Sequence, residues 1–136
     1  LLTRSALASG QLPPPRHVVM LGTPNQQPRL APYAWQLPPF RWVTGQCGGN
    51  LANADFFTTL PPLTSPYTII AGTAGPRGTW SPFGHDKNDG IVAVPETRMR
   101  ESDRIIELPV NHTFMMHDRI LQTQVISVLK TAHVNY

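Results

Sequence analysis

Three short apolar runs, each bounded by proline or glycine, form the clearest hydrophobic pattern in the chain. Residues 17–21 lie between a proline cluster and a glycine, residues 67–72 end in glycine, and residues 104–110 have a proline next to their last position. Continuous apolar runs of this length are typical of buried parallel strands. The proline at the end of the third run favours a strand end or a sheet edge. We therefore expect three strands of one sheet.

Two segments have the pattern of helices. Residues 1–7 are rich in helix formers and lack an N-capping residue, and Ser9 and Gly10 then read as a helix stop. At the other end, Asp118 is expected to cap a closing amphipathic helix of about a dozen residues. The apolar face predicted for that helix comprises Ile120, Leu121, Val125, Ile126 and Leu129.

Residues 28–66 carry seven prolines together with several aromatic residues, and no regular period is visible in them. Proline breaks helices and cannot donate to a sheet ladder, so we expect an irregular insertion of short helical turns and loops. Long stretches of this kind are commonly lids or binding walls, and a plain packed excursion is the alternative. The aromatic group Trp35, Phe40 and Trp42 is expected either to line an acyl pocket or to pack in the core.

The order of helix, strand, long loop, strand, loop, strand and helix predicts an α/β fold with a mostly parallel sheet and flanking helices. Residues 1–136 are long enough for one domain and too short for two. A first helix without a cap, and strands with few helices between them, indicate that the chain is the C-terminal portion of a single larger domain. Such a piece would expose a sheet edge, which predicts poor solubility alone.

Composition mainly excludes other classes of protein. The net charge is +3, and the basic residues are scattered without interleaved aromatics, which argues against nucleic-acid binding. Cys47 is the single cysteine, which excludes an internal disulfide, and we expect it to be a buried or half-buried thiol. No apolar run is long enough for a transmembrane helix. Without a signal-peptide pattern the cytoplasm is favoured, although the first residue is not methionine.

Polar residues that could do chemistry follow the second and third strands. The loop after residues 67–72 contains Asp86 and Asp89, and the loop after residues 104–110 contains His112. The carboxyl ends of parallel strands share one edge of the sheet, where catalytic groups collect. A carboxylate there can fix the tautomer of a histidine whose other ring nitrogen acts as a general base.

Three segments resemble the bacterial lipases and esterases of the α/β-hydrolase superfamily. Asn88-Asp89-Gly90-Ile91-Val92 is similar to the segment that carries the triad aspartate, and His112 follows Asp89 by 23 residues, after an asparagine, as the triad histidine does there. Residues 21–24 are similar to the "LGTP" turn of these families, which follows the strand after the nucleophile helix. The resemblance implies that Asp89 is the triad acid and His112 the general base.

The triad order in this fold is serine, acid and histidine, with the serine in Gly-x-Ser-x-Gly. No serine of the chain has glycines at both flanking positions, and Ser81 reads as a turn residue. The segment Leu1-Leu2-Thr3-Arg4 is similar to the start of the helix that follows the nucleophile. The resemblance therefore implies that the nucleophile and the oxyanion-hole donors lie upstream of Leu1.

Each site residue has an ordinary alternative role. Asp89 could be a turn residue before Gly90, and Asp86 is the rival acid. His85 could bind a metal ion with a neighbouring aspartate, although no oxygen cage is apparent and no metal site is expected. The run Phe114-Met115-Met116, with His117 at its end, is expected to pack beneath the histidine loop, and contact with the substrate is the alternative.

We expect a parent serine hydrolase that cleaves a small-molecule or lipid carboxylic ester through an acyl-enzyme, without a dissociable cofactor. The chain alone, without its nucleophile, is expected to be inactive. The alternatives are a non-catalytic binding or scaffold protein of the same fold and a small α/β interaction domain with a proline-rich surface.

Overall fold

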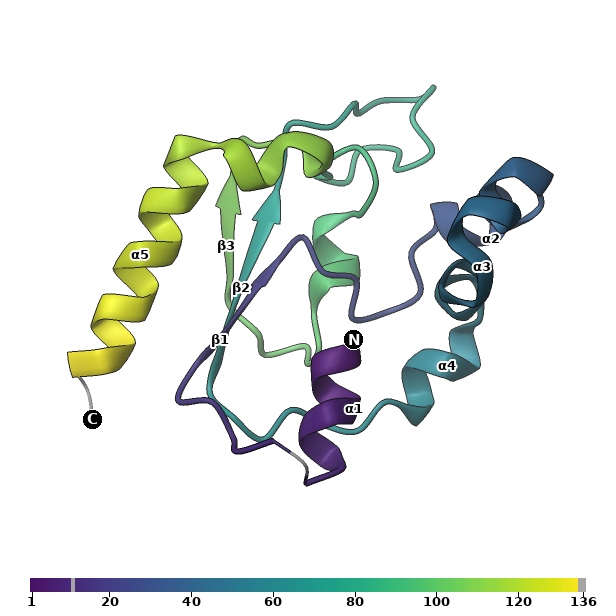
Figure 1. The fold of residues 1–136 in the computed structure, drawn as a ribbon. Coiled ribbons are helices and arrows are strands. Elements are labelled where there is room, and N and C mark those ends of the chain that lie inside the picture. Colours follow the sequence, from purple (N-terminus) through teal and green to yellow (C-terminus); the bar gives the residue numbers. More distant parts are fainter. Residues whose placement is uncertain (11, 135–136) are drawn as a thin grey trace.

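The computed structural model describes residues 1–10 and 12–134, which form an α/β fold around a three-stranded parallel sheet (Figure 1). The strands β1 (Val18–Leu21), β2 (Tyr67–Gly72) and β3 (Ile105–Leu108) lie side by side in this order, with β2 in the centre. The register places Met20 opposite Ile69, and Ile70 opposite Ile106. The predicted fold class and all three strands are thus confirmed.

Successive residues of a strand point to opposite faces of the sheet, so both faces carry apolar side chains. One terminal helix packs on each face. On one face, Met20 and Ile69 pack with Leu7 of α1 (Leu2–Ala8). On the other face, Ile70 packs with Leu121 of α5 (Arg119–Val134). Both helices were predicted from their patterns. As predicted, Asp118 caps α5, because its Oδ1 accepts from the backbone N–H groups of Ile120 and Leu121.

Helix α5 buries less of its apolar stripe than its pattern indicates. Leu121 is buried and Val125 packs against the same cluster. The other members of the predicted face, Ile120, Ile126 and Leu129, are exposed. The physical reason is the narrow sheet, since three short strands offer too little surface for the whole length of a 16-residue helix.

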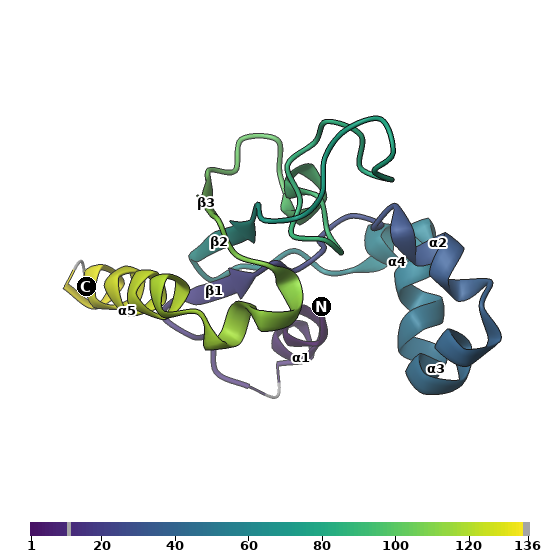
Figure 2. The same ribbon diagram turned by 90° about the horizontal axis from the view of Figure 1, so that it is seen from above.

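Residues 28–66 are more helical than the sequence analysis predicted. They contain α2 (Leu30–Trp35), α3 (Pro38–Ala52) and α4 (Ala54–Thr59). The paired prolines begin α3, where proline is tolerated because the first amides of a helix have no partner within it. Figures 1 and 2 show these helices set apart from the sheet, as a lobe joined to it by two connecting segments.

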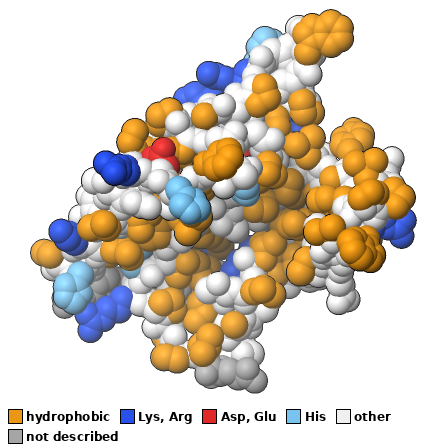
Figure 3. All heavy atoms as spheres, turned by 45° about the horizontal axis from the view of Figure 1, so that its top comes forward, with side chains coloured by type: hydrophobic (Ala, Val, Ile, Leu, Met, Phe, Trp, Pro, Cys, Tyr) orange, Lys and Arg blue, Asp and Glu red, His pale blue; other side chains and the backbone are white. Residues whose placement is uncertain are grey.

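The lobe of α2, α3 and α4 carries much of the exposed apolar surface. Figure 3 shows hydrophobic side chains gathered on it. The exposed set includes Tyr33, Leu37, Val43 and Trp42, the last with 89% of its surface accessible. Cys47 of α3 is also exposed, so the expectation of a buried thiol is wrong. The reason is that α3 projects from the sheet instead of packing on it.

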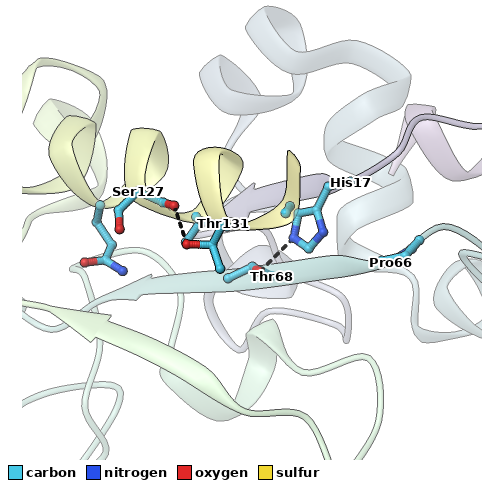
Figure 4. A pocket seen from close by; sticks show the side chains of 8 residues that line it. His17, Pro66, Thr68, Ser127 and Thr131 are labelled. Carbon is cyan, nitrogen blue, oxygen red and sulfur yellow. Dashed lines mark hydrogen bonds between the residues drawn. The ribbon is translucent and has the colours of Figure 1, made fainter. Parts of the chain in front are cut away.

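A groove with a mixed polar and apolar lining lies at the amino end of the strands, between β1, β2 and α5 (Figure 4). Its volume is about 560 Å³. The ring of His17 is hydrogen-bonded to the Thr68 hydroxyl at 2.9 Å, and the Thr131 hydroxyl donates to the backbone oxygen of Ser127 (Figure 4). The loops after β2 and β3, which carry the residues expected to be catalytic, leave the opposite end of the sheet.

Candidate catalytic site

The two loops that were expected to meet do so at the carboxyl ends of β2 and β3. The backbone N–H of His112 donates to the backbone oxygen of Asp89 at 2.9 Å. The backbone N–H of Ala74, just after β2, donates to the oxygen of Val110, just after β3, at 3.3 Å. These bonds tie the acid loop to the histidine loop before any side chain is considered.

Asp89 is almost fully enclosed, with 1% of its surface accessible. Its Oδ1 accepts from the backbone N–H groups of Ile91 at 3.0 Å and Val92 at 2.8 Å. Its Oδ2 accepts from Nδ1 of His112 at 2.7 Å. Each oxygen therefore has at least one donor, as a buried carboxylate requires. Gly90 follows in the left-handed region, with φ of 99°, and turns the chain so that these amides face the carboxylate.

His112 begins a short 3₁₀ helix, η2 (His112–His117), which the sequence analysis treated as a loop. The side chain of Asn111 caps this helix by accepting from the N–H of Thr113 at 3.1 Å. The His112 side chain is 32% exposed, so the ring is held on its Nδ1 side and open elsewhere. Among the described residues, no hydrogen bond is made by its Nε2 atom.

The pKa of His112 lies above its usual value. The hydrogen bond to Asp89 is the largest cause and the negative charge of Asp89 adds to it, while partial burial of the ring opposes them. A buried carboxylate on Nδ1 fixes the tautomer in which Nε2 carries the free lone pair. The pair is therefore arranged to accept a proton at Nε2 and to hold the resulting charge.

Two glycines make room for the pair. A β-carbon on Gly22, at the end of β1, would lie 2.9 Å from Oδ2 of Asp89 and 3.2 Å from Nδ1 of His112. A β-carbon on Gly72, at the end of β2, would lie 2.7 Å from the Asp89 β-carbon and would collide with the Val110 oxygen. The "LGTP" turn named for its resemblance is thus in direct contact with the pair.

Sequence reasoning missed one residue that supports the pair, whereas Met115 was expected to pack beneath the histidine loop. Met115 is buried, and its methyl group lies close to the positions that β-carbons on Gly22 and Gly72 would take. Asn88 is fully buried and uses its whole amide in hydrogen bonds within the acid loop. The Asn-Asp-Gly sequence is a turn signal, but it does not say which side chain turns inward.

The alternative residues occupy other places. Asp86 pairs with Arg29 at 2.5 Å and makes no contact with His112. His85 and His117 lie on the surface, so the expectation that His117 packs beneath the histidine loop is wrong. Ser81 donates its hydroxyl to the oxygen of Pro76 at 2.8 Å and serves as a turn residue.

No serine hydroxyl of the described residues is hydrogen-bonded to His112. Within the same part of the chain, no cluster of three or more His, Cys, Asp or Glu side chains has the geometry to hold a metal ion.

An apolar pocket of about 380 Å³ lies between the start of α1 and the lobe. Its lining includes Leu1, Leu2, Leu51 and Phe56, and the aromatic group named from the sequence takes no part in it. Leu1 also lines a smaller cavity with Thr23, the residue next to Gly22. The apolar pocket therefore adjoins, at Leu1, a cavity that reaches the turn after β1.

Comparison with known proteins finds no matching family model, no matching curated protein and no matching solved structure. In the described part of the chain, no helix combines the length and the apolar character needed to cross a membrane.

Proposed function

We propose that this chain provides the acid and the base of a serine hydrolase that cleaves carboxylic esters through an acyl-enzyme. The observation that carries the proposal is the 2.7 Å hydrogen bond between His112 Nδ1 and the buried carboxylate of Asp89. It occurs at the carboxyl edge of a parallel sheet, where catalytic groups of open α/β folds collect. A buried acid that orients a partly open histidine is the arrangement that a hydroxyl nucleophile needs.

In the first half of the reaction, Nε2 of His112 takes the proton of the serine hydroxyl as its oxygen attacks the ester carbonyl carbon. The same Nε2 then gives that proton to the departing alkoxide, so the alcohol leaves and the acyl group stays on serine. In the second half, Nε2 takes a proton from water as the water oxygen attacks the acyl carbon. It then gives this proton to the serine oxygen as the bond between serine and the acyl carbon breaks and the acid is released. Asp89 remains ionised throughout and stabilises the imidazolium.

The serine and the oxyanion-hole donors belong, in this proposal, to sequence outside the 136 residues. Two observations support this. No serine hydroxyl of the described residues is bonded to His112. In addition, β1 is an edge strand whose end, at Gly22, adjoins the pair. A further strand paired on this edge would end beside His112, as a strand leading to a nucleophile must.

The apolar pocket beside α1 supports a substrate with an apolar group. Its lining by Leu1, Leu51 and Phe56 suits the hydrocarbon part of a small-molecule or lipid ester. The chain by itself is expected to be inactive, because the nucleophile and the oxyanion hole contribute most of the rate enhancement.

The test uses the intact protein encoded by the gene and a chromogenic acyl ester. The His112→Ala variant is expected to lose at least about a thousandfold in kcat, as removal of a triad base does. His117→Ala is the matched control, because His117 lies on the surface at the far end of the same 3₁₀ helix. A fluorophosphonate probe should label a single serine in a Gly-x-Ser-x-Gly sequence.

An unchanged rate in His112→Ala would rule the proposal out. An intact protein with no hydrolysis and no labelled serine would instead favour the alternative of a non-catalytic protein with the same fold. The two readouts are independent, because labelling reports the nucleophile and the variant reports the base.

A further inference from the structure

Asn88 is the residue of the acid loop with the most complete set of side-chain hydrogen bonds. Its amide Nδ2 donates to the backbone oxygens of Pro76 at 2.8 Å and Asp86 at 3.1 Å. Its Oδ1 accepts from the N–H of Gly90 at 3.0 Å. None of its surface is accessible. All three partners are backbone groups, so the side chain organises the path of the chain and not another side chain.

The three bonds hold the loop on both sides of Asp89. Asp86 precedes the acid, Gly90 follows it, and Pro76 belongs to the strand exit after β2. The backbone of Asn88 adds a fourth tie, since its oxygen accepts from the N–H of Gly75 at 2.8 Å. A long excursion between residues 76 and 88 is thereby closed at its base.

The side chain of Asn88 lies close against the backbone at the exit of β2. A β-carbon on Gly75 would collide with Oδ1 of Asn88 and with the Gly90 nitrogen. The Asn88 side chain thus fills the space between the exit of β2 and the turn that carries the carboxylate. Asp89 itself receives only two backbone amides on Oδ1, from residues within its own turn.

We propose that Asn88 is a positioning residue, which acts through Asp89 by fixing the turn that aims its Oδ2 at Nδ1 of His112. The inference deepens the proposed function, but it rests on the Asp89–His112 pair and not on turnover. If the side chain is removed, the Pro76 and Asp86 oxygens lose a donor and the Gly90 N–H loses its acceptor. The turn can then shift, and the carboxylate moves away from the ring.

The test measures the protonation of His112 by NMR in the folded protein, with the resonances assigned by loss of signal in His112→Gln. Asn88→Ala is expected to lower the pKa of His112 towards the ordinary value of about 6.5. It should also speed the exchange of the Nδ1 proton with water. Asn88→Ser is expected to recover part of both effects, because a serine hydroxyl makes the same kind of turn bond more weakly.

Asn25→Ala is the matched control for loss of a buried asparagine. Asn25 is also buried and donates Nδ2 to the Thr97 backbone oxygen at 2.7 Å, but it makes no hydrogen bond within the acid loop. A purely structural role for Asn88 would make Asn88→Ala behave like Asn25→Ala, with lower stability and an unchanged His112 pKa. That result would overturn the inference.

Asp89→Asn separates this inference from the proposed function. If Asp89→Asn lowers the pKa of His112 and Asn88→Ala does not, Asn88 is no positioning residue while the acid–base pair stands. If Asp89→Asn leaves the pKa unchanged, the pair does not form in solution and both proposals fail. Retained ester hydrolysis in His112→Ala would contradict the proposed function alone.

Discussion

At the scale of single residues, the site depends on glycines, which have no side chain, as much as on Asp89 and His112. Gly22 and Gly72 end neighbouring strands, and the Asp89–His112 pair fills the space that their side chains would take. Gly22 also has a φ of 53°, in the left-handed region that other residues adopt at a cost. The pair is therefore supported by strand ends that come unusually close to it.

Gly22→Ala is expected to destabilise the protein more than Gly84→Ala. The two glycines have similar φ values, 53° and 58°, so both substitutions pay the left-handed cost of about 1–2 kcal/mol. A β-carbon at Gly84 meets nothing within 4 Å, whereas at Gly22 it meets Asp89 and Met115. Crowding should add about 1–3 kcal/mol, measured as a difference in free energy of unfolding by urea. Equal losses would show that the space at Gly22 is not constrained.

The ionisation of His112 predicts a pH-dependent contribution to stability. Because the folded-state pKa of His112 is raised by Asp89, its stabilising effect is fully present below the unfolded-state pKa of about 6.5. The effect is lost as the pH rises through the higher folded-state pKa. His112→Gln should therefore lower the free energy of unfolding more at pH 5.5 than at pH 8.5, in urea titrations at both values.

The Asp89→Asn background provides the control for this prediction. Without the carboxylate, the hydrogen bond to a charged partner is lost, and the effect of His112→Gln should become nearly the same at the two pH values. A pH dependence that persists in the Asp89→Asn background would assign it to other groups.

At the scale of elements, the strands were readable from the sequence and the helices only in part. The three apolar runs are each marked by proline or glycine, and in the first two a proline precedes the run and a glycine ends or follows it. This pattern was enough to predict a buried central strand such as β2. Helix α3 was not predicted because it begins with prolines. The sequence alone does not distinguish a proline that begins a helix from one that interrupts it. η2 was missed because a 3₁₀ helix of six residues is too short to show a period in the sequence.

The two main residues of the site could be predicted from the sequence, but the residue that holds them in place could not. The loops after β2 and β3 had to share an edge, so Asp89 and His112 could be paired before the structure was known, and their catalytic role stays a prediction. Asn88 is different, because its role depends on which side chain of the Asn-Asp-Gly turn points inward. Its side chain fills space beside Gly75, and this close approach cannot be read from the local sequence.

Helix α5 is attached to the sheet through few side chains, and Leu121 is the one most deeply buried. Leu121→Ala should cost about 2–5 kcal/mol in free energy of unfolding, as large-to-small changes in a core do. Ile126→Ala is the matched control, because Ile126 is exposed on the same helix, and it should change stability by less than about 0.5 kcal/mol. A similar loss in both variants would mean that the apolar stripe of α5 is covered in solution.

At the scale of the whole molecule, the unpaired edge of β1 is the most consequential feature. The N–H groups of Val18 and Gly22 donate to the β2 side, so the alternate N–H groups of β1 face away from the sheet. Hydrophobic parallel strands are normally covered on every side. Within the described residues, this strand has a partner on one side only.

The 136-residue chain alone is therefore expected to self-associate at micromolar concentration. Edge pairing and the exposed apolar residues of the lobe both favour this. Sedimentation velocity over a tenfold range of concentration should show a rising average mass. A concentration-independent monomer with a cooperative thermal transition would show that the edge is protected.

The neighbouring methionines of η2 give the site a specific response to oxidants. Met116 is exposed, while Met115 is buried and its methyl group lies beside Gly22 and Gly72, the two glycines that make room for the Asp89–His112 pair. Peroxide should convert Met116 to the sulfoxide first, with little effect on the pair, because susceptibility follows access to solvent. Oxidation of Met115 would then place a polar oxygen in the packed space beside these glycines, so the pKa of His112 should change only in this second phase, as resolved by peptide mass spectrometry and NMR. Chemical ageing of the protein would thus damage the site late and abruptly, after an exposed neighbour has been consumed.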